Sequence, residues 1–222
     1  MQEQIQETLQ EEKTLSLFEL LFSGGIAGTI VISILLILLF VAIYIYFERF
    51  FTIKTASNYD EHFMKKIRNK VSSGQIIEAN ELCLEVDSPV SRLTQKGISR
   101  IGKPLEDINT AIENAGRLEV YKLEKNVSIL ATIAGAGPMI GFLGTVIGMV
   151  LAFHQLATSS GQADMGSLAE GIYTAMTTTV AGLIVGIVAY IGYNHLVVKT
   201  DKAVHQMEAT AVDFLDLLNE PA

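Results

Sequence analysis

Threonine hydroxyls are concentrated in the last of the long apolar stretches of this 222-residue chain. Four of them gather in the segment TAMTTT: Thr174, Thr177, Thr178 and Thr179. A threonine in an apolar helix usually bonds back to a carbonyl one turn earlier. Successive helical residues turn by about 100°, so these four cannot all face one direction. We therefore expect some of them to face a neighbouring helix or a water-filled space.

The same apolar stretches contain no Asp, Glu, Lys or Arg. An ionisable side chain inside a membrane is the usual mark of an ion pathway. If the protein conducts protons, a partner must therefore supply the titrating acid. His154 and His195 lie near the ends of the stretches, where an interfacial location is a better prediction than a ligand role. The lone Cys83 allows neither a disulfide nor a thiol metal cluster, so we predict no metal site and no cofactor.

The elements that position the threonines follow from the distribution of charge. Half of the residues are hydrophobic and only 18% are charged, which is typical of a membrane protein. Charge-free runs cover 20–47, 126–163 and 171–198, and each exceeds the roughly 20 residues that a helix needs to span a bilayer. We predict an all-α membrane protein with three transmembrane helices at 20–47, 126–158 and 171–198.

Basic residues predict the orientation of these spans. Of the 16 Lys and Arg, one precedes the first span, 13 lie between the first two spans, none lies between the last two, and two follow the third. The positive-inside rule then places the N-terminus outside and the long loop in the cytoplasm. The expected parts outside the membrane are an extracytoplasmic segment at 1–19, a cytoplasmic helical domain at 48–125, an extracytoplasmic loop at 159–170 and a cytoplasmic C-terminal helix at 199–222. Nothing in this charge pattern predicts a nucleic-acid partner.

The cytoplasmic part reads as short helices with recognisable ends. Ser73-Gly74, Asp87-Ser88-Pro89 and Gly102-Lys103-Pro104 are stop signals. From about Leu105 the pattern shows no strong stop before Gly135, so the last cytoplasmic helix is expected to run directly into the second span. After the third span an apolar stripe is expected to pack against the other cytoplasmic helices; it comprises Val204, Met207, Ala211, Phe214 and Leu218.

Small residues mark one face of the second span and one face of the third. On the second span the glycines recur at spacings of 4, 3 and 4; they are Gly137, Gly141, Gly144 and Gly148. On the third span Gly182 and Gly186 form a GxxxG pair. Such stripes let helix backbones approach closely in lipid, so both faces are expected to contact protein. The first span is instead a run of Ile, Leu, Val and Phe, as a lipid-facing helix requires.

These segments resemble a known family. Residues 113–149 (ENAGRLEVYKLEKNVSILATIAGAGPMIGFLGTVIGM) followed by 171–194 (GIYTAMTTTVAGLIVGIVAYIGYN) are similar to the MotA/TolQ/ExbB proton channel family, in particular its three-span ExbB and TolQ branch. Residues 74–93 are similar to that branch's cytoplasmic segment. The four-span flagellar branch fits less well because only three spans are present.

The resemblance implies a bacterial inner-membrane complex driven by the proton-motive force, so the extracytoplasmic parts at 1–19 and 159–170 are expected in the periplasm. Members form a pentamer around the single transmembrane helices of an ExbD- or TolR-type partner, whose aspartate binds and releases protons. The complex energises a TonB- or TolA-type protein. By resemblance the second and third spans line the pore, with Thr145 and Thr179 as its polar residues, Thr178 as a weaker candidate and Thr174 as a further pore-lining candidate.

Two positions depart from the family pattern. Thr174 stands where ExbB and TolQ members commonly have a glutamate, and Glu170 is a candidate substitute one turn earlier. Val188 stands where they commonly have a proline, so the third span is expected to be straighter. A passive membrane scaffold, in which the threonines and glycines only join helices, is the alternative function. An enzyme is disfavoured because the sequence shows no catalytic cluster or phosphate-binding loop.

Overall fold

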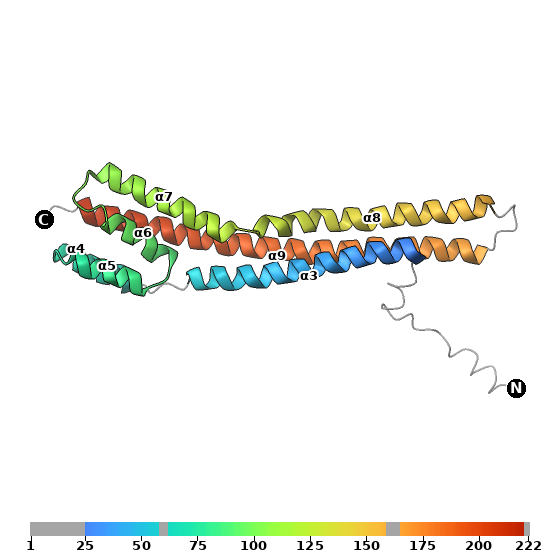
Figure 1. The fold of residues 1–222 in the computed structure, drawn as a ribbon, viewed down its shortest axis with the longest axis horizontal. Helices are drawn as coiled ribbons and strands as arrows, with labels where there is room; N and C mark the ends of the chain where they lie inside the picture. Colours follow the sequence, from blue (N-terminus) through green and yellow to red (C-terminus); the bar gives the residue numbers. More distant parts are fainter. Residues whose placement is uncertain (1–24, 58–61, 159–164, 220–222) are drawn as a thin grey trace, which may run out of the picture. The chain divides into compact units, whose positions relative to one another are not determined.

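The computed structural model describes residues 25–57, 62–158 and 165–219, and all the regular elements in these ranges are helices (Figure 1). The helices, labelled as in Figure 1, are α3 (Gly25–Ser57), α4 (His62–Ser72), α5 (Ile76–Glu85), α6 (Pro89–Ile98), α7 (Leu105–Glu124), α8 (Val127–Thr158) and α9 (Met165–Asn219). The predicted all-α fold class is therefore confirmed. The expected periplasmic segment at 1–19 lies outside the described residues.

Three stretches of helix are long and apolar enough to cross a membrane: Gly28–Ser57, the stretch Leu105–Thr158 that joins α7 and α8, and Gly171–Asn219. The apolar part of the second stretch begins after Lys125, within α8. The first stretch overlaps the predicted span at 20–47, and the other two contain the predicted spans at 126–158 and 171–198. The chain divides into two compact units: the first unit (Met1–Val41 and Thr132–Ala189) and the second unit (Ala42–Ala131 and Tyr190–Ala222).

In the first unit, glycines bring α8 and α9 into close contact. A methyl group added to Gly141 would lie 2.6 Å from the Thr178 carbonyl oxygen, and one added to Gly182 would lie 2.6 Å from the Gly137 carbonyl oxygen. A methyl group on Gly186 would meet the ring of Pro138 at 2.7 Å. Because these distances are below any normal carbon contact, the glycines let the two backbones touch. This contact explains why so apolar a helix as α8 carries several glycines and a proline.

Helix α3 meets this pair with small or branched aliphatic side chains. Val31, Ile32 and Leu35 are buried, and Val31 lies beside Gly144 of α8. Other large side chains of α3, such as Ile37 and Phe40, are exposed. An apolar exposed face is what a helix in lipid requires.

In the second unit, the predicted stop signals end or begin helices. Gly74 and Gly102 have φ angles of +73° and +92°, a left-handed conformation that favours glycine. Ser88 caps α6: its hydroxyl accepts from the Ser91 amide at 3.1 Å, and the Ser88 amide donates back to the Ser91 hydroxyl at 3.2 Å. These turns fold the loop into short helices that pack together.

The predicted continuous helix from Leu105 into the second span is wrong. Helix α7 ends at Glu124 and α8 begins at Val127, because Asn126 adopts a φ of +64°. Asparagine tolerates this left-handed conformation better than most residues, and the Asn126 carbonyl accepts a hydrogen bond from the Ile129 amide at 3.1 Å. The polar pair Lys125-Asn126 therefore separates the charged helix from the apolar one.

The C-terminal part of α9 packs through its predicted apolar stripe. Met207 and Phe214 are buried, together with Ala203 and Leu217, and the other members of the stripe are half-buried. The Phe214 ring lies so close to Gly97 of α6 that a methyl group there would come within 2.4 Å of it. The expectation that this stripe packs against other helices of the loop is confirmed.

Candidate functional site

Thr145 and Thr179 bring their hydroxyl groups together in the first unit. Thr145 is on α8 and Thr179 on α9, and their Oγ1 atoms are hydrogen-bonded to each other. The small residues around them make this possible, since Gly141 lies one turn before Thr145, Gly144 lies next to it, and both allow α9 to approach. Both threonines are half-buried rather than sealed.

Backbone carbonyls complete the hydrogen bonding of the pair. The Thr145 hydroxyl also lies 2.9 Å from the Ala175 carbonyl oxygen, and the Thr179 hydroxyl lies 3.3 Å from the Gly141 carbonyl oxygen. Two hydroxyls carry two protons, whereas these contacts offer three places for them. One of the three contacts therefore always lacks a proton, so a hydroxyl proton can change partners within the pair.

Thr178, the neighbouring candidate, has a different environment. Its side chain is only 1% exposed, and its hydroxyl lies 2.7 Å from the Ala175 carbonyl oxygen on its own helix and 3.0 Å from the Gly141 carbonyl oxygen on α8. Gly144 makes room for this side chain, since an added methyl group would lie 2.5 Å from the Thr178 hydroxyl oxygen. In this position Thr178 joins α8 to α9.

The remaining members of TAMTTT lie towards the start of α9. The Thr177 hydroxyl donates to the Thr174 carbonyl at 2.7 Å, which is the back-bonding expected of an apolar helix. Thr174 is half-buried, and its methyl group faces Gly28 of α3. The Glu170 side chain lies outside the described part of the structure. The structure thus brings together Thr145 and Thr179, with Thr178 beside them, and leaves Thr174 apart.

A hydroxyl pair sets limits on the chemistry. Threonine does not titrate near neutral pH, so the pair can donate to and accept from a carboxylate or a water but cannot itself carry a proton through a pH cycle. The predicted spans contain no acidic residue. Within the residues described, no group of three His, Cys, Asp or Glu side chains could hold a metal ion.

The second unit holds an ion-pair network that the sequence did not indicate. Glu119 on α7 is buried, and its carboxylate accepts from Arg92 Nη2 and from Lys122 Nζ, both at 2.7 Å. Burial alone would raise the pKa of Glu119, but the hydrogen bonds from Arg92 and Lys122 outweigh it and lower that pKa. Arg92 also pairs with the exposed Asp87. The Glu119–Lys122 pair has the local i,i+3 spacing, but only tertiary packing of α6 against α7 brings Arg92 to Glu119, so the sequence could not have revealed that contact.

Arg49 is one of the 13 basic residues between the first two predicted spans. The structure buries it to 8% exposure, paired with Glu48, and its Nη1 donates to the Lys122 carbonyl at 3.1 Å. That carbonyl belongs to the last turn of α7, where helical partners are missing. Arg49, which lies on α3, therefore supplies a hydrogen-bond donor to a free carbonyl at the C-terminal end of α7.

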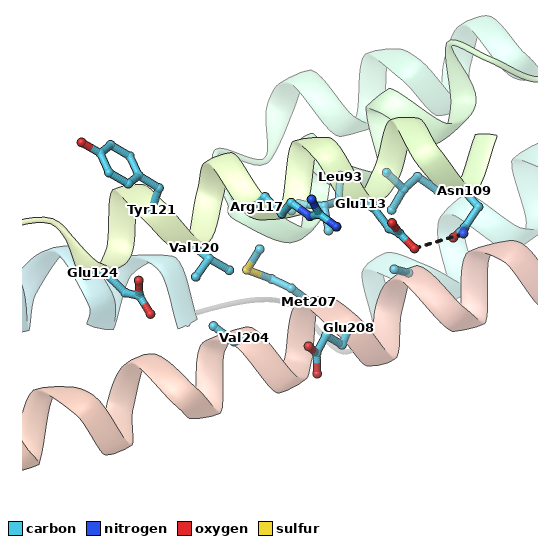
Figure 2. Close-up of a pocket in the computed structure, with 13 residues that line it drawn as sticks. Leu93, Asn109, Glu113, Arg117, Val120, Tyr121, Glu124, Val204, Met207 and Glu208 are labelled. Atoms are coloured by element: carbon cyan, nitrogen blue, oxygen red, sulfur yellow. Dashed lines mark hydrogen bonds between the residues drawn. The ribbon is translucent and has the colours of Figure 1, made fainter. Parts of the chain in front are cut away.

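The second unit also holds a polar contact between α3 and α9 and a cavity between α7 and α9. His195 Nδ1 lies 2.8 Å from the Tyr46 hydroxyl, so this histidine is held in a polar contact between α3 and α9. A cavity of about 590 Å³ lies between α7 and α9, with Val120, Val204 and Met207 among its apolar residues (Figure 2). On its rim the Asn109 amide donates to Glu113 at 3.2 Å.

Comparisons with known proteins agree with this architecture. The sequence model of the MotA/TolQ/ExbB proton channel family matches residues 85–209. An ExbB homolog of the biopolymer transport type from Methanothermobacter thermautotrophicus is 29% identical over 160 residues, 66% of this chain and 56% of the relative. The Tol-Pal system protein TolQ of Pseudomonas aeruginosa is 32% identical over 129 residues, 58% of this chain and 55% of the relative. The biopolymer transport protein ExbB of Helicobacter pylori is 38% identical over 79 residues, 36% of this chain and 54% of the relative. The chain spans about half the length of these curated relatives.

Proposed function

Because this chain belongs to the MotA/TolQ/ExbB proton channel family, we propose that it is an ExbB- or TolQ-like subunit of an inner-membrane motor driven by the proton-motive force. Several copies, a pentamer by resemblance, form a pore around the transmembrane helices of an ExbD- or TolR-type partner. The complex transmits force to a TonB- or TolA-type protein that crosses the periplasm. The family is a proton channel family rather than a class of enzymes.

The hydrogen-bonded pair of Thr145 and Thr179 is the observation that supports this proposal best. It offers a polar position in spans that have no acid of their own. A partner aspartate beside the pair would receive a hydrogen bond when charged and donate one when protonated. The threonines therefore solvate the acid in both states, while the proton itself travels on the partner.

Three long apolar helices and the family together make the chain a multi-pass membrane protein. The proposed orientation has the N-terminus in the periplasm and the C-terminus in the cytoplasm. Its support is the 13 basic residues between the first two spans, against none between the last two. With this orientation the second unit lies on the cytoplasmic side.

Proton flux through reconstituted complexes tests the proposal. The chain is co-expressed with its ExbD/TolR-type partner, and proteoliposomes are loaded with a pH-sensitive dye and given a potassium diffusion potential. We expect flux when both proteins are present, and a loss of flux when the partner's transmembrane aspartate is replaced by asparagine. If the intact complex shows no flux above empty liposomes, or if the aspartate variant conducts as well as the wild type, the chain would be a scaffold rather than part of a channel.

A further inference from the structure

A second cavity lies in the second unit, where the end of α3 runs beside α9. It has a volume of about 600 Å³ and is lined by the lysines Lys54, Lys199 and Lys202 and by the rings of Phe50 and Phe51. Thr55 adds a hydroxyl group. Two helices far apart in the sequence thus contribute the basic groups, and aromatic rings form a wall beside them.

The charge of this cavity is unbalanced. None of the described residues that line it is acidic, and none of the ion pairs in the described part of the chain involves its three lysines. By contrast, Arg92 and Lys122 elsewhere in this unit each have a carboxylate partner. Three like charges around one space repel each other, so an anion in it would be stabilised. Each ammonium group offers three donors, which suits the several oxygens of a phosphate.

The approach to the cavity along α3 is apolar. Tyr44, Phe47, Phe51 and Lys54 recur at spacings of 3, 4 and 3, so they share one helix face. All three aromatic side chains are well exposed, at 71%, 52% and 60%. A ligand whose charged end enters the cavity would therefore have an aromatic track for an apolar part.

Helix α9 repeats this arrangement. Ile191, Val198 and Lys202 lie at spacings of 7 and 4, and the two aliphatic side chains are 63% and 66% exposed. On both helices the apolar face ends at a lysine that lines the cavity. This surface is complementary to an amphiphilic ligand. The apolar face would contact the ligand's apolar part, and the lysines, where each span leaves the apolar region, would contact its anionic group.

From these features we infer that the cavity binds the phosphate headgroup of an anionic phospholipid, with its acyl chains along Tyr44, Phe47 and Phe51. Lys54, Lys199 and Lys202 contact the phosphate, and Thr55 donates a further hydrogen bond. This lipid site is distinct from the threonine pair and does not depend on proton conduction. Its role is to fix the end of α3 against the middle of α9 at the membrane surface.

Native mass spectrometry of the full chain tests the site. The protein is purified in detergent, stripped of lipid and offered an equimolar mixture of phosphatidylglycerol and phosphatidylcholine. We expect the wild type to retain phosphatidylglycerol in preference to phosphatidylcholine by about tenfold. The variant Lys54→Gln/Lys199→Gln/Lys202→Gln should lose this preference, and the corresponding triple Lys→Arg variant should keep it.

A matched control removes the same charge elsewhere. The variant Lys96→Gln/Arg100→Gln/Lys103→Gln alters three exposed residues around the end of α6 and should retain the lipid preference. Equal lipid preference in the wild type and the first Gln variant would overturn the inference. So would displacement of the lipid by millimolar inorganic phosphate, which would assign the cavity to a soluble anion. A change of oligomeric mass without a change in bound lipid would assign it to contacts between copies of the chain.

Discussion

Thr145 of α8 and Thr179 of α9 share a hydrogen bond between their hydroxyl groups, although 34 residues separate them in the sequence. The contact exists because Gly141 and Gly182 remove the side chains that would hold the two helices apart. The glycines therefore set the distance between the two helices, and this short distance allows the threonine hydroxyls to form a hydrogen bond.

The close approach of α8 and α9 predicts that Gly141→Ala is destabilising. Its methyl group would lie 2.6 Å from a backbone oxygen of α9, so a helix must move, at a cost of about 1–3 kcal/mol. Gly135→Ala is the control on the same helix, because nothing lies within 4 Å of its added methyl group. Thermal unfolding in detergent should give a lower midpoint for Gly141→Ala and an unchanged or higher one for Gly135→Ala. Equal midpoints would contradict the packing described here.

The buried carboxylate of Glu119 is expected to make a pH-dependent contribution to the free energy of unfolding. Glu119→Gln removes a buried charge that accepts from Arg92 and Lys122, and it should lower the free energy of unfolding by about 1–3 kcal/mol at pH 7. The pKa of Glu119 is lowered in the folded protein, so this contribution is fully present above the ordinary carboxylate pKa of about 4.3. It is lost as the pH falls through the lowered value.

Chemical denaturation at pH 7 and at decreasing pH measures this contribution. The difference between the wild type and Glu119→Gln should shrink with acidification. Glu124→Gln, on the exposed side of the same helix, should differ little from the wild type at any pH. A Glu119→Gln effect that stays constant with pH would show that the carboxylate charge is not what stabilises the fold.

Removal of the Arg49 guanidinium is expected to destabilise the last turn of α7. Arg49→Met keeps an apolar stem but removes the donor to the Lys122 carbonyl, so the last turn of α7 should open more often. Hydrogen–deuterium exchange of the amides around Asn126 should then be faster, by a factor that corresponds to about 1 kcal/mol. Protection in the α4 and α5 peptides should not change. Unchanged exchange around Asn126 would mean that Arg49 does not hold this helix end.

The buried thiol of Cys83 is expected to react slowly with maleimide. Burial raises its pKa to about 12, so very little thiolate exists at pH 8. Maleimide labelling of the folded wild type should be about a hundredfold slower than labelling of Cys83→Ser/Ser99→Cys, in which the thiol is on an exposed position. Labelling at comparable rates would show that α5 opens readily.

The sequence predicted the parts of this fold that depend on local chemistry. Gly74, Ser88 and Gly102 each mark a turn through a conformation or a cap that few other residues provide, so the short helices could be located in advance. The break at Asn126 could not, because asparagine is compatible with both a helix interior and a left-handed turn. The pattern around it contained no glycine or proline to decide the matter.

The candidate site was predictable only in part. The glycine spacing predicted which helix faces contact protein, but it did not predict that Thr178 would be buried while Thr179 stays half-exposed beside Thr145. That distinction depends on the rotation of α9 about its axis. In the sequence, the lysines of the lipid site indicated only the topology. Their proximity could not be predicted, because only the packing of α3 beside α9 brings Lys54 close to Lys199 and Lys202.

Proton flux in the threonine variants shows whether the hydroxyl pair of Thr145 and Thr179 takes part in proton conduction. Complexes containing Thr145→Val or Thr179→Val should assemble with the partner yet conduct about 10- to 100-fold more slowly, since a hydrogen bond to a charged group contributes about 1.5–3 kcal/mol. The corresponding Ser variants should conduct, and Thr177→Val, which removes only a back-bonded hydroxyl, should match the wild type. Wild-type flux in both Thr145→Val and Thr179→Val would contradict the account, because the hydroxyl pair would then serve helix packing alone.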